Sequence, residues 1–193
     1  MSQTTLDIRG AFLAVVAALA EERTAHAFIG ALPVLAWGRV RATTDIDLVV
    51  AVTDNWDRLS AALGRRGITQ RKQIGPADAA DRLPDVAVFF SAGDQPVRVD
   101  VFIAKTHFER TVIDTAREAT VLGITVRLAR PEASIIYKLL AQRRRDVDDV
   151  EGIFAARQAA AEALDWQFLE TWANAWGIMD RLDPYRLRYG PAC

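Results

Sequence analysis

Asp45 and Asp47 are separated by one residue in the segment Asp-Ile-Asp-Leu-Val-Val at residues 45–50. Because successive side chains of a β-strand point to opposite faces, the two carboxylates would share one face while Ile46 and Leu48 point into a core. Two like charges this close are unfavourable without a neutralising cation, and hard oxygen donors suit Mg²⁺ or Mn²⁺ better than Zn²⁺. The pattern therefore indicates a metal site. The alternative is an exposed strand face that carries acid twice by chance.

Asp100 is a third candidate metal ligand, in the middle of the apolar run at residues 97–103. This run and residues 85–90 are rich in β-branched and aromatic side chains and flank a turn-like Gly-Asp-Gln-Pro sequence, which predicts a β-hairpin. An acid inside an apolar strand is costly to bury unless a cation pairs with it. A metal ion shared with Asp45 and Asp47 would neutralise Asp100. A salt bridge from Asp100 to Arg98 or Arg41 is the alternative.

Gly30 lies between a short apolar run at residues 27–29 and Pro33, which suits the first turn of a helix running through Trp37. A glycine at such a turn permits close approach of the backbone to a ligand, and helix N-termini favour anions. We therefore expect a triphosphate to lie across Gly30 and Ala31, beside the aspartate pair. An ordinary connection between a strand and a helix is the alternative for a glycine taken alone.

In combination these motifs resemble the polymerase-β-type nucleotidyltransferase superfamily, and the resemblance spans roughly residues 25 to 155. Within that superfamily the chain is most similar to the AbiEii-like branch, the toxins of type IV toxin-antitoxin systems. The residues that carry the resemblance are Gly30-x7-Gly38-x2-Arg41-x-Thr43-x-Asp45-Ile46-Asp47-Leu48, then Val99-Asp100-Val101, then Lys138-Leu139-Leu140-Ala141-x4-Asp146-x2-Asp149.

The resemblance implies an α/β (α+β) fold in which a small mixed sheet is flanked by helices. Residues 1–130 would form the nucleotidyltransferase core, and residues 131–193 a C-terminal helical lobe packed on it in a single compact unit. The implied activity is transfer of a nucleoside monophosphate from an NTP to an acceptor hydroxyl with two Mg²⁺ or Mn²⁺ ions. The implied site comprises metal ligands Asp45, Asp47 and Asp100, nucleotide contacts Gly30, Ala31, Arg41, Thr43 and Lys138, and catalytic residues Asp100, Lys138 and Asp146.

Ala31 departs from the family pattern, which usually has Gly or Ser after the first glycine. A serine hydroxyl would add a hydrogen bond to phosphate, whereas Ala31 offers only its backbone N–H. This difference bears on rate or substrate choice more than on fold. The acceptor favoured by the resemblance is RNA, at a tRNA end, in a toxin-like role with a cognate antitoxin. The alternatives are adenylyl transfer to a small molecule such as an antibiotic, and a catalytically weak module that binds a nucleotide or a partner.

Composition is consistent with a cytoplasmic enzyme. The 193 residues are enough for one domain with a full core, and the formal net charge of −1 argues against a general nucleic-acid coat. Charge is nevertheless concentrated locally, in basic clusters at residues 65–66, 71–72 and 143–145. The single cysteine, Cys193, cannot form an internal disulfide, which suits a reducing compartment. Residues 11–20 indicate an amphipathic helix rather than a signal peptide, and no apolar run reaches the ~18 residues of a membrane span.

Several further elements position these candidates. Residues 68–74 are typical of an edge strand, and residues 120–128 of a strand around Gly123. Pro131 predicts the start of a helix on which Lys138 stands at the edge of an apolar arc, with a snorkelling surface lysine as the alternative. Two further helices are expected, at residues 146–161 and 165–176.

Overall fold

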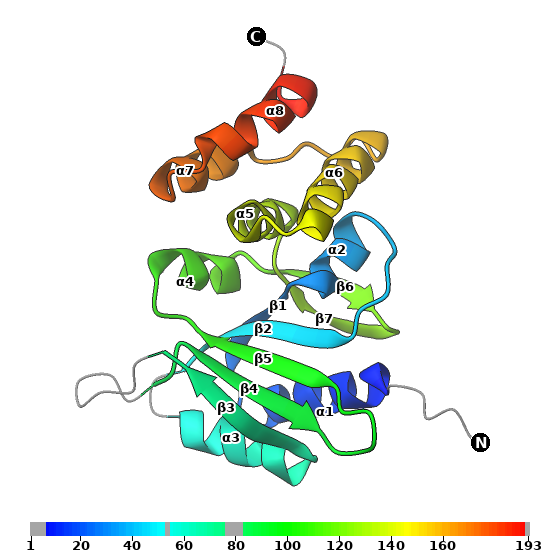
Figure 1. Cartoon of the computed structure of the whole chain (residues 1–193), viewed down its shortest axis with the longest axis vertical. Helices are drawn as coiled ribbons and strands as arrows, with labels where there is room; N and C mark the ends of the chain where they lie inside the picture. The colour runs from blue at the N-terminus through cyan, green and yellow to red at the C-terminus, as the bar shows by residue number, and fades with distance from the viewer. Residues whose placement is uncertain (1–6, 53–54, 76–82, 192–193) are drawn as a thin grey trace.

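A computed structural model describes residues 7–52, 55–75 and 83–191 of the chain. Within these residues a mixed sheet has seven strands in the order β3-β4-β5-β2-β1-β7-β6, with helices on both faces (Figure 1). The strands are β1 (Ala25–Ile29), β2 (Asp45–Ala51), β3 (Ile68–Ile74), β4 (Val86–Ser91), β5 (Arg98–Ile103), β6 (Arg117–Val121) and β7 (Ile124–Leu128). The helices are α1 (Ile8–Glu21), α2 (Ala31–Trp37), α3 (Trp56–Arg65), α4 (His107–Asp114), α5 (Pro131–Ala141), α6 (Arg144–Ala159), α7 (Trp166–Ala175) and α8 (Met179–Tyr189).

Strand β2 lies at the centre of the sheet, parallel to β5 and antiparallel to β1. Its residues Ile46, Leu48 and Val50 are buried in a core shared with α1 and α3, so the alternation predicted for this strand is confirmed. The predicted hairpin is also confirmed, because β4 and β5 pair antiparallel, and β3 forms an edge of the sheet as expected.

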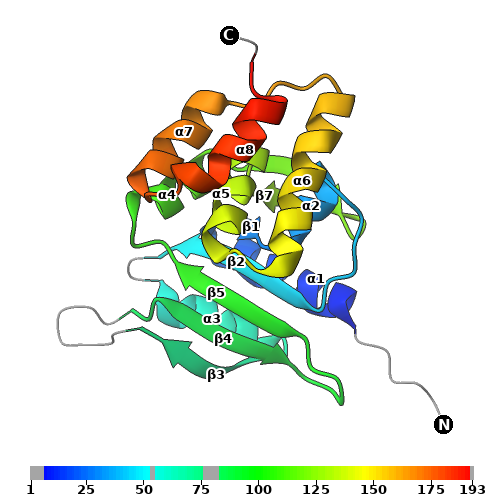
Figure 2. The ribbon, with the colours of Figure 1, turned by 45° about the horizontal axis from the view of Figure 1, so that its top comes forward.

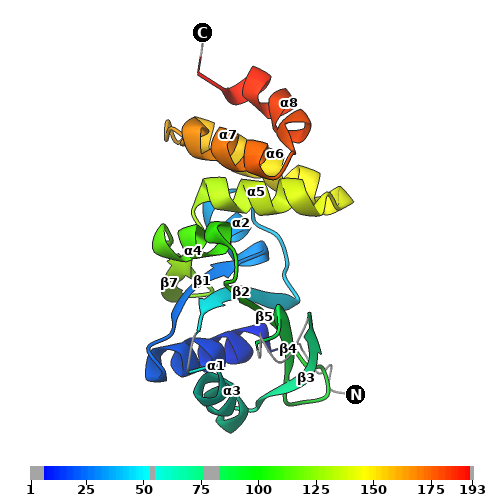
Figure 3. The same cartoon turned by 90° about the vertical axis from the view of Figure 1, so that its left-hand side faces the viewer.

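The opposite face of the sheet is covered by α2 and α4 to α8, which form a second hydrophobic core with β1 and β2. Figure 3 shows α5 lying between the sheet and the outer helices α6, α7 and α8. In the described part of the chain, none of the helices combines the length and the apolar character needed to cross a bilayer.

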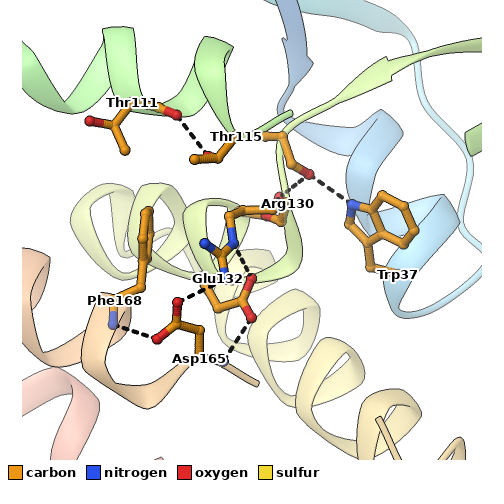
Figure 4. Close-up of polar contacts among 9 residues, drawn as sticks. Trp37, Thr111, Thr115, Arg130, Glu132, Asp165 and Phe168 are labelled. Atoms are coloured by element: carbon orange, nitrogen blue, oxygen red, sulfur yellow. Dashed lines mark hydrogen bonds and ion pairs between the residues drawn. The ribbon is translucent and has the colours of Figure 1, made fainter. Parts of the chain in front are cut away.

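Helix α5 begins at Pro131, as predicted from the proline, and is tied to α7 by a buried acid (Figure 4). Glu132 is only 1% exposed. Its Oε2 accepts a hydrogen bond from Arg130 Nε at 2.7 Å, and its Oε1 accepts one from the backbone N–H of Asp165 at 2.8 Å. Arg130 also lies 3.1 Å from Asp165 Oδ2, so the start of α7 is fixed to the start of α5 by charge-assisted contacts.

Two sequence-based expectations were wrong. Residues 120–128 are not one strand, because Leu122 and Gly123 have φ angles of 51° and 77° and turn β6 into β7 as a two-residue hairpin. The C-terminal region contains a third helix after α5 in addition to the two expected, namely α8. Its polar sequence, its internal Pro184 and its single buried residue, Leu182, leave little helical periodicity to detect.

Candidate functional site

A cavity of about 600 Å³ is lined by residues of the sheet, of α5 and of the start of α6. Figure 2 shows these two helices on one face of the sheet. The cavity is lined by every site residue predicted from the sequence except Thr43. The predicted residues in its wall are Gly30, Ala31, Arg41, Asp45, Asp47, Asp100, Lys138 and Asp146. A second cavity, of about 640 Å³, lies between the ends of α6 and α8 and includes none of the predicted residues.

The three aspartates share one face of the sheet. Asp47 of β2 pairs in register with Asp100 of β5, and directly paired residues of neighbouring strands point to the same side. Asp45 lies two residues before Asp47 and is therefore on the same face, where it pairs with Arg98. Thr43, which is not part of the cavity wall, donates hydrogen bonds from Oγ1 to the backbone oxygen of Asp45 at 2.9 Å and to its Oδ1 at 3.2 Å.

Arg98 neutralises one of these carboxylates. Its Nε donates to Oδ1 of Asp100 at 2.8 Å, and the hydrogen bond to Asp100 is the main reason that the pKa of Arg98 is raised. The salt-bridge alternative for Asp100 is therefore present in the structure. Among the described residues, no group of three or more Asp, Glu, His or Cys side chains is arranged to hold a metal ion as it stands. The assignment of Asp45, Asp47 and Asp100 as metal ligands remains a prediction.

The carboxyl of Asp47 has a strongly raised pKa. Burial, as the largest cause, together with the negative charges of Asp45 and Asp100 raises the pKa of this carboxyl from an ordinary 3.8 to about 7. Lys138 and Arg143 oppose the shift without cancelling it. A buried carboxylate beside two others favours a proton or a cation, so the chemistry of this donor set suits a hard divalent ion.

The Gly30 turn lies directly against Asp47. Gly30 precedes the first residue of α2 with φ of 69°, a conformation that favours glycine. A Cβ added to Gly30 would lie 2.0 Å from Oδ2 of Asp47. The glycine predicted as the phosphate-turn residue therefore has a role within the protein as well, because it makes room for an aspartate on the neighbouring strand.

Lys138 and Asp146 meet although they are eight positions apart in the sequence. The chain reverses between α5 and α6, where Gln142 has a left-handed backbone conformation with φ of 49°. Nζ of Lys138 donates to Oδ1 of Asp146 at 2.9 Å and also lies 2.9 Å from Oδ2 of Asp149. Both aspartate side chains are 1–2% exposed and that of Lys138 is 9% exposed. The alternative of a snorkelling surface lysine was therefore wrong.

Two residues were missed as site members by sequence reasoning. Asp149 was noted only as part of the motif, yet it joins Lys138 to Arg41, whose Nε lies 3.1 Å from Asp149 Oδ1. Its spacing of three residues from Asp146, one turn along the same helix, was the available signal. Arg98 was named only as an alternative salt-bridge partner of Asp100, although strand alternation indicated that the two side chains share a face.

Comparison with known proteins supports the fold. No protein-family model matches the chain, and no curated protein sequence matches it. The solved structure of the antibiotic-resistance factor ANT(2″)-Ia is similar with a TM-score of 0.58 at 16% identity, covering 95% of this chain and 99% of that chain. ANT(2″)-Ia in complex with adenylyl-2″-tobramycin gives a TM-score of 0.53 at 17% identity, covering 86% and 95% of the two chains. A nucleotidyltransferase-like protein from Paracoccidioides brasiliensis gives 0.55 at 21% identity, covering 97% and 95%.

These similarities extend over nearly the whole chain, and they confirm the α/β nucleotidyltransferase fold predicted from the sequence. At 16 to 21% identity they concern the fold and not the reaction. The AbiEii-like branch stays a prediction.

Proposed function

We propose that this protein is a metal-dependent nucleotidyltransferase that transfers a nucleoside monophosphate from an NTP to an acceptor hydroxyl. The observation that carries this proposal is the alignment of Asp45, Asp47 and Asp100 on one sheet face, in a cavity that also contains the Gly30 turn and Lys138. The fold shared with nucleotidyltransferases supports the same reaction class.

The roles follow from the side chains of the cavity. Asp45, Asp47 and Asp100 would hold two Mg²⁺ or Mn²⁺ ions, which when bound lower the pKa of the acceptor hydroxyl and stabilise the charge on the departing pyrophosphate. Asp100 accepts the hydroxyl proton as the acceptor oxygen forms its bond to the α-phosphorus and the bond to the pyrophosphate oxygen breaks. The backbone of Gly30 and Ala31 binds the triphosphate.

Lys138 is our candidate for a direct phosphate contact. Its ammonium lines the cavity and is held by the buried carboxylates of Asp146 and Asp149, which keep the charge in one position. We assign Asp146 the role of orienting Lys138. Arg41 neutralises the carboxylate of Asp149, the second acid that contacts Lys138. Thr43 acts through Asp45, whose carboxylate it orients by a hydrogen bond.

For the acceptor we propose the end of an RNA, with a tRNA end as the first candidate. Arg143 and Arg145 line the same cavity as the aspartates and project from the start of α6. Arginine presents a planar fork of donors that matches phosphate oxygens, so these side chains suit a polyanionic acceptor better than a neutral one. In this reading the protein acts as a toxin, and a cognate antitoxin is its expected protein partner.

A small-molecule acceptor is the second candidate, favoured by the likeness to ANT(2″)-Ia. That protein is an antibiotic-resistance factor whose complex contains adenylyl-2″-tobramycin, and the similarity covers 99% and 95% of its chain in the two structures. The same three aspartates would then serve adenylyl transfer to an antibiotic hydroxyl. A catalytically weak nucleotide-binding module is the remaining alternative, which Ala31 leaves open.

One experiment distinguishes these possibilities. Each α-labelled NTP is incubated with the protein and Mg²⁺ or Mn²⁺, either with total tRNA or with tobramycin, and Asp47→Asn serves as the inactive control. Label on RNA supports the leading proposal, and label on tobramycin supports the second candidate. Nucleotide binding with no label on either acceptor would contradict both transfer proposals. The protein would then be a catalytically weak nucleotide-binding module. Growth arrest on expression, relieved by an antitoxin, tests the toxin role.

A further inference from the structure

Arg98 brings a fixed positive charge to the carboxylate face. It stands opposite Asp45 in the β2–β5 register, two residues before Asp100, and its guanidinium donates to Asp100 Oδ1 at 2.8 Å. The Arg98 side chain is half exposed whereas that of Asp100 is 14% exposed, and both residues line the cavity.

The pair has a consequence for metal binding. An oxygen of Asp100 that accepts the Arg98 hydrogen bond has less capacity to coordinate a cation, and a guanidinium beside three carboxylates repels a second cation. The arrangement also helps to explain how three aspartates can share one face of the sheet in the folded protein. Arg98 supplies part of the neutralisation that Asp45, Asp47 and Asp100 require.

We propose that Arg98 and a divalent metal ion compete for Asp100, so that Arg98 sets the metal concentration at which the site becomes active. This inference rests on the proposed function, because it assumes that Asp100 is a metal ligand. Arg98 is in this sense a positioning residue that acts through Asp100. In the metal-free protein Arg98 holds the carboxylate of Asp100 in place, and the hydrogen bond between them breaks when a metal ion binds Asp100.

The test is a direct measurement of Mn²⁺ and Mg²⁺ affinity by titration calorimetry, with Mn²⁺ paramagnetic resonance as a second readout. We expect Arg98→Gln to bind metal roughly three- to tenfold more tightly, since a charge-assisted hydrogen bond at a half-exposed site no longer has to be displaced. Arg98→Lys keeps the charge and should stay near the wild-type affinity. Arg145→Gln removes the same charge from the same cavity without touching Asp100, and should shift the affinity by about twofold or less.

A double-mutant cycle identifies the path of the effect. In an Asp100→Asn background, Arg98→Gln should shift metal affinity by about twofold or less, the effect of removing a charge from the cavity without the Asp100 hydrogen bond. An equal gain from Arg145→Gln, or an Arg98→Gln variant that loses affinity for NTP but not for metal, would overturn the inference and make Arg98 a general charge or a phosphate contact. If wild type binds metal and transfers nucleotide while Arg98→Gln has the wild-type metal affinity, only this inference fails. If wild type binds no divalent ion, the proposed metal-dependent function fails together with it.

Discussion

The carboxylate of Asp47 rests on Gly30, so closely that a Cβ at Gly30 would lie 2.0 Å from Oδ2 of Asp47. Ile29, the residue before the glycine, pairs in register with Asp47 across the antiparallel β1 and β2. The turn proposed for phosphate and the strand proposed for metal are therefore a single packed unit. A change in one of these two residues must disturb the other.

Gly30→Ala should lower both stability and activity. The new Cβ collides with Asp47, and φ of 69° is unfavourable for any residue with a Cβ. Gly123→Ala is the matched control, because Gly123 has φ of 77° with nothing within 4 Å of the added atom. We expect a loss of about 1 kcal/mol for the control and at least about twice that for Gly30→Ala, measured by urea unfolding.

If the collision is the cause, adding Asp47→Ala to Gly30→Ala should recover part of the lost stability. Equal losses for Gly30→Ala and Gly123→Ala would contradict the packing argument and leave only backbone strain.

Asp47→Asn should abolish transfer and yet stabilise the metal-free protein at neutral pH. The pKa of Asp47 is about 7 in the folded protein against an ordinary 3.8. Between these values the folded state keeps a proton that the unfolded chain has released, so the contribution of Asp47 to stability falls as pH rises from 4 to 7. Above pH 7 the loss in free energy of unfolding caused by ionised Asp47 reaches its full value, up to about 4 kcal/mol for a pKa shift of this size.

The measurement is urea unfolding of wild type and Asp47→Asn in chelator, from pH 4 to pH 8. The two curves of stability against pH should coincide near pH 4 and diverge towards pH 7, with the variant more stable. Adding Mg²⁺ should reduce this difference in stability between the variant and wild type. A constant difference across this range would show that Asp47 is not held at a raised pKa.

Lys138→Ala should weaken the fold as well as catalysis. The structure shows that this ammonium neutralises Asp146 and Asp149, both almost fully buried. Leaving buried acids without their partner costs about 3 to 5 kcal/mol. Lys138→Met combined with Asp149→Asn should recover much of that stability by removing one unpaired charge.

The catalytic role of Lys138 is then read from the stabilised double variant. A lost charge-assisted phosphate contact should lower kcat by roughly one to two decades. Turnover within twofold of the Asp149→Asn single variant would reduce Lys138 to a structural residue.

Gly38→Ala should loosen the contact between α2 and α6. A Cβ on Gly38 would lie 2.9 Å from Cγ1 of Ile153 and 3.0 Å from its backbone nitrogen, so the two helices would have to separate. We expect a loss of about 1 to 3 kcal/mol in the free energy of unfolding. Gly64→Ala, in α3 with nothing within 4 Å, is the control and should be neutral or stabilising. Similar effects for both variants would show that the α2–α6 contact adapts easily.

Local rules of the chain made much of this protein predictable. The two-residue period of a strand separated Asp45 and Asp47 from Ile46 and Leu48, and the structure confirms that separation. The start of α5 at a proline and the hairpin of β4 with β5 were likewise predictable, because each depends on residues close together in the chain.

The remainder depends on contacts between distant segments, which a single sequence does not encode in any local pattern. The in-register pairing of Asp47 with Asp100 requires β2 and β5 to lie parallel at one particular offset, and a shift by one residue would put Asp100 on the other face. The burial of Lys138 between Asp146 and Asp149 depends on the reversal between α5 and α6. By itself, then, the sequence determined which residue types were available for chemistry and which face of its own element each would occupy. Only the tertiary structure decided which charges meet, because an ion pair forms where packing brings two elements together, whatever their separation along the chain.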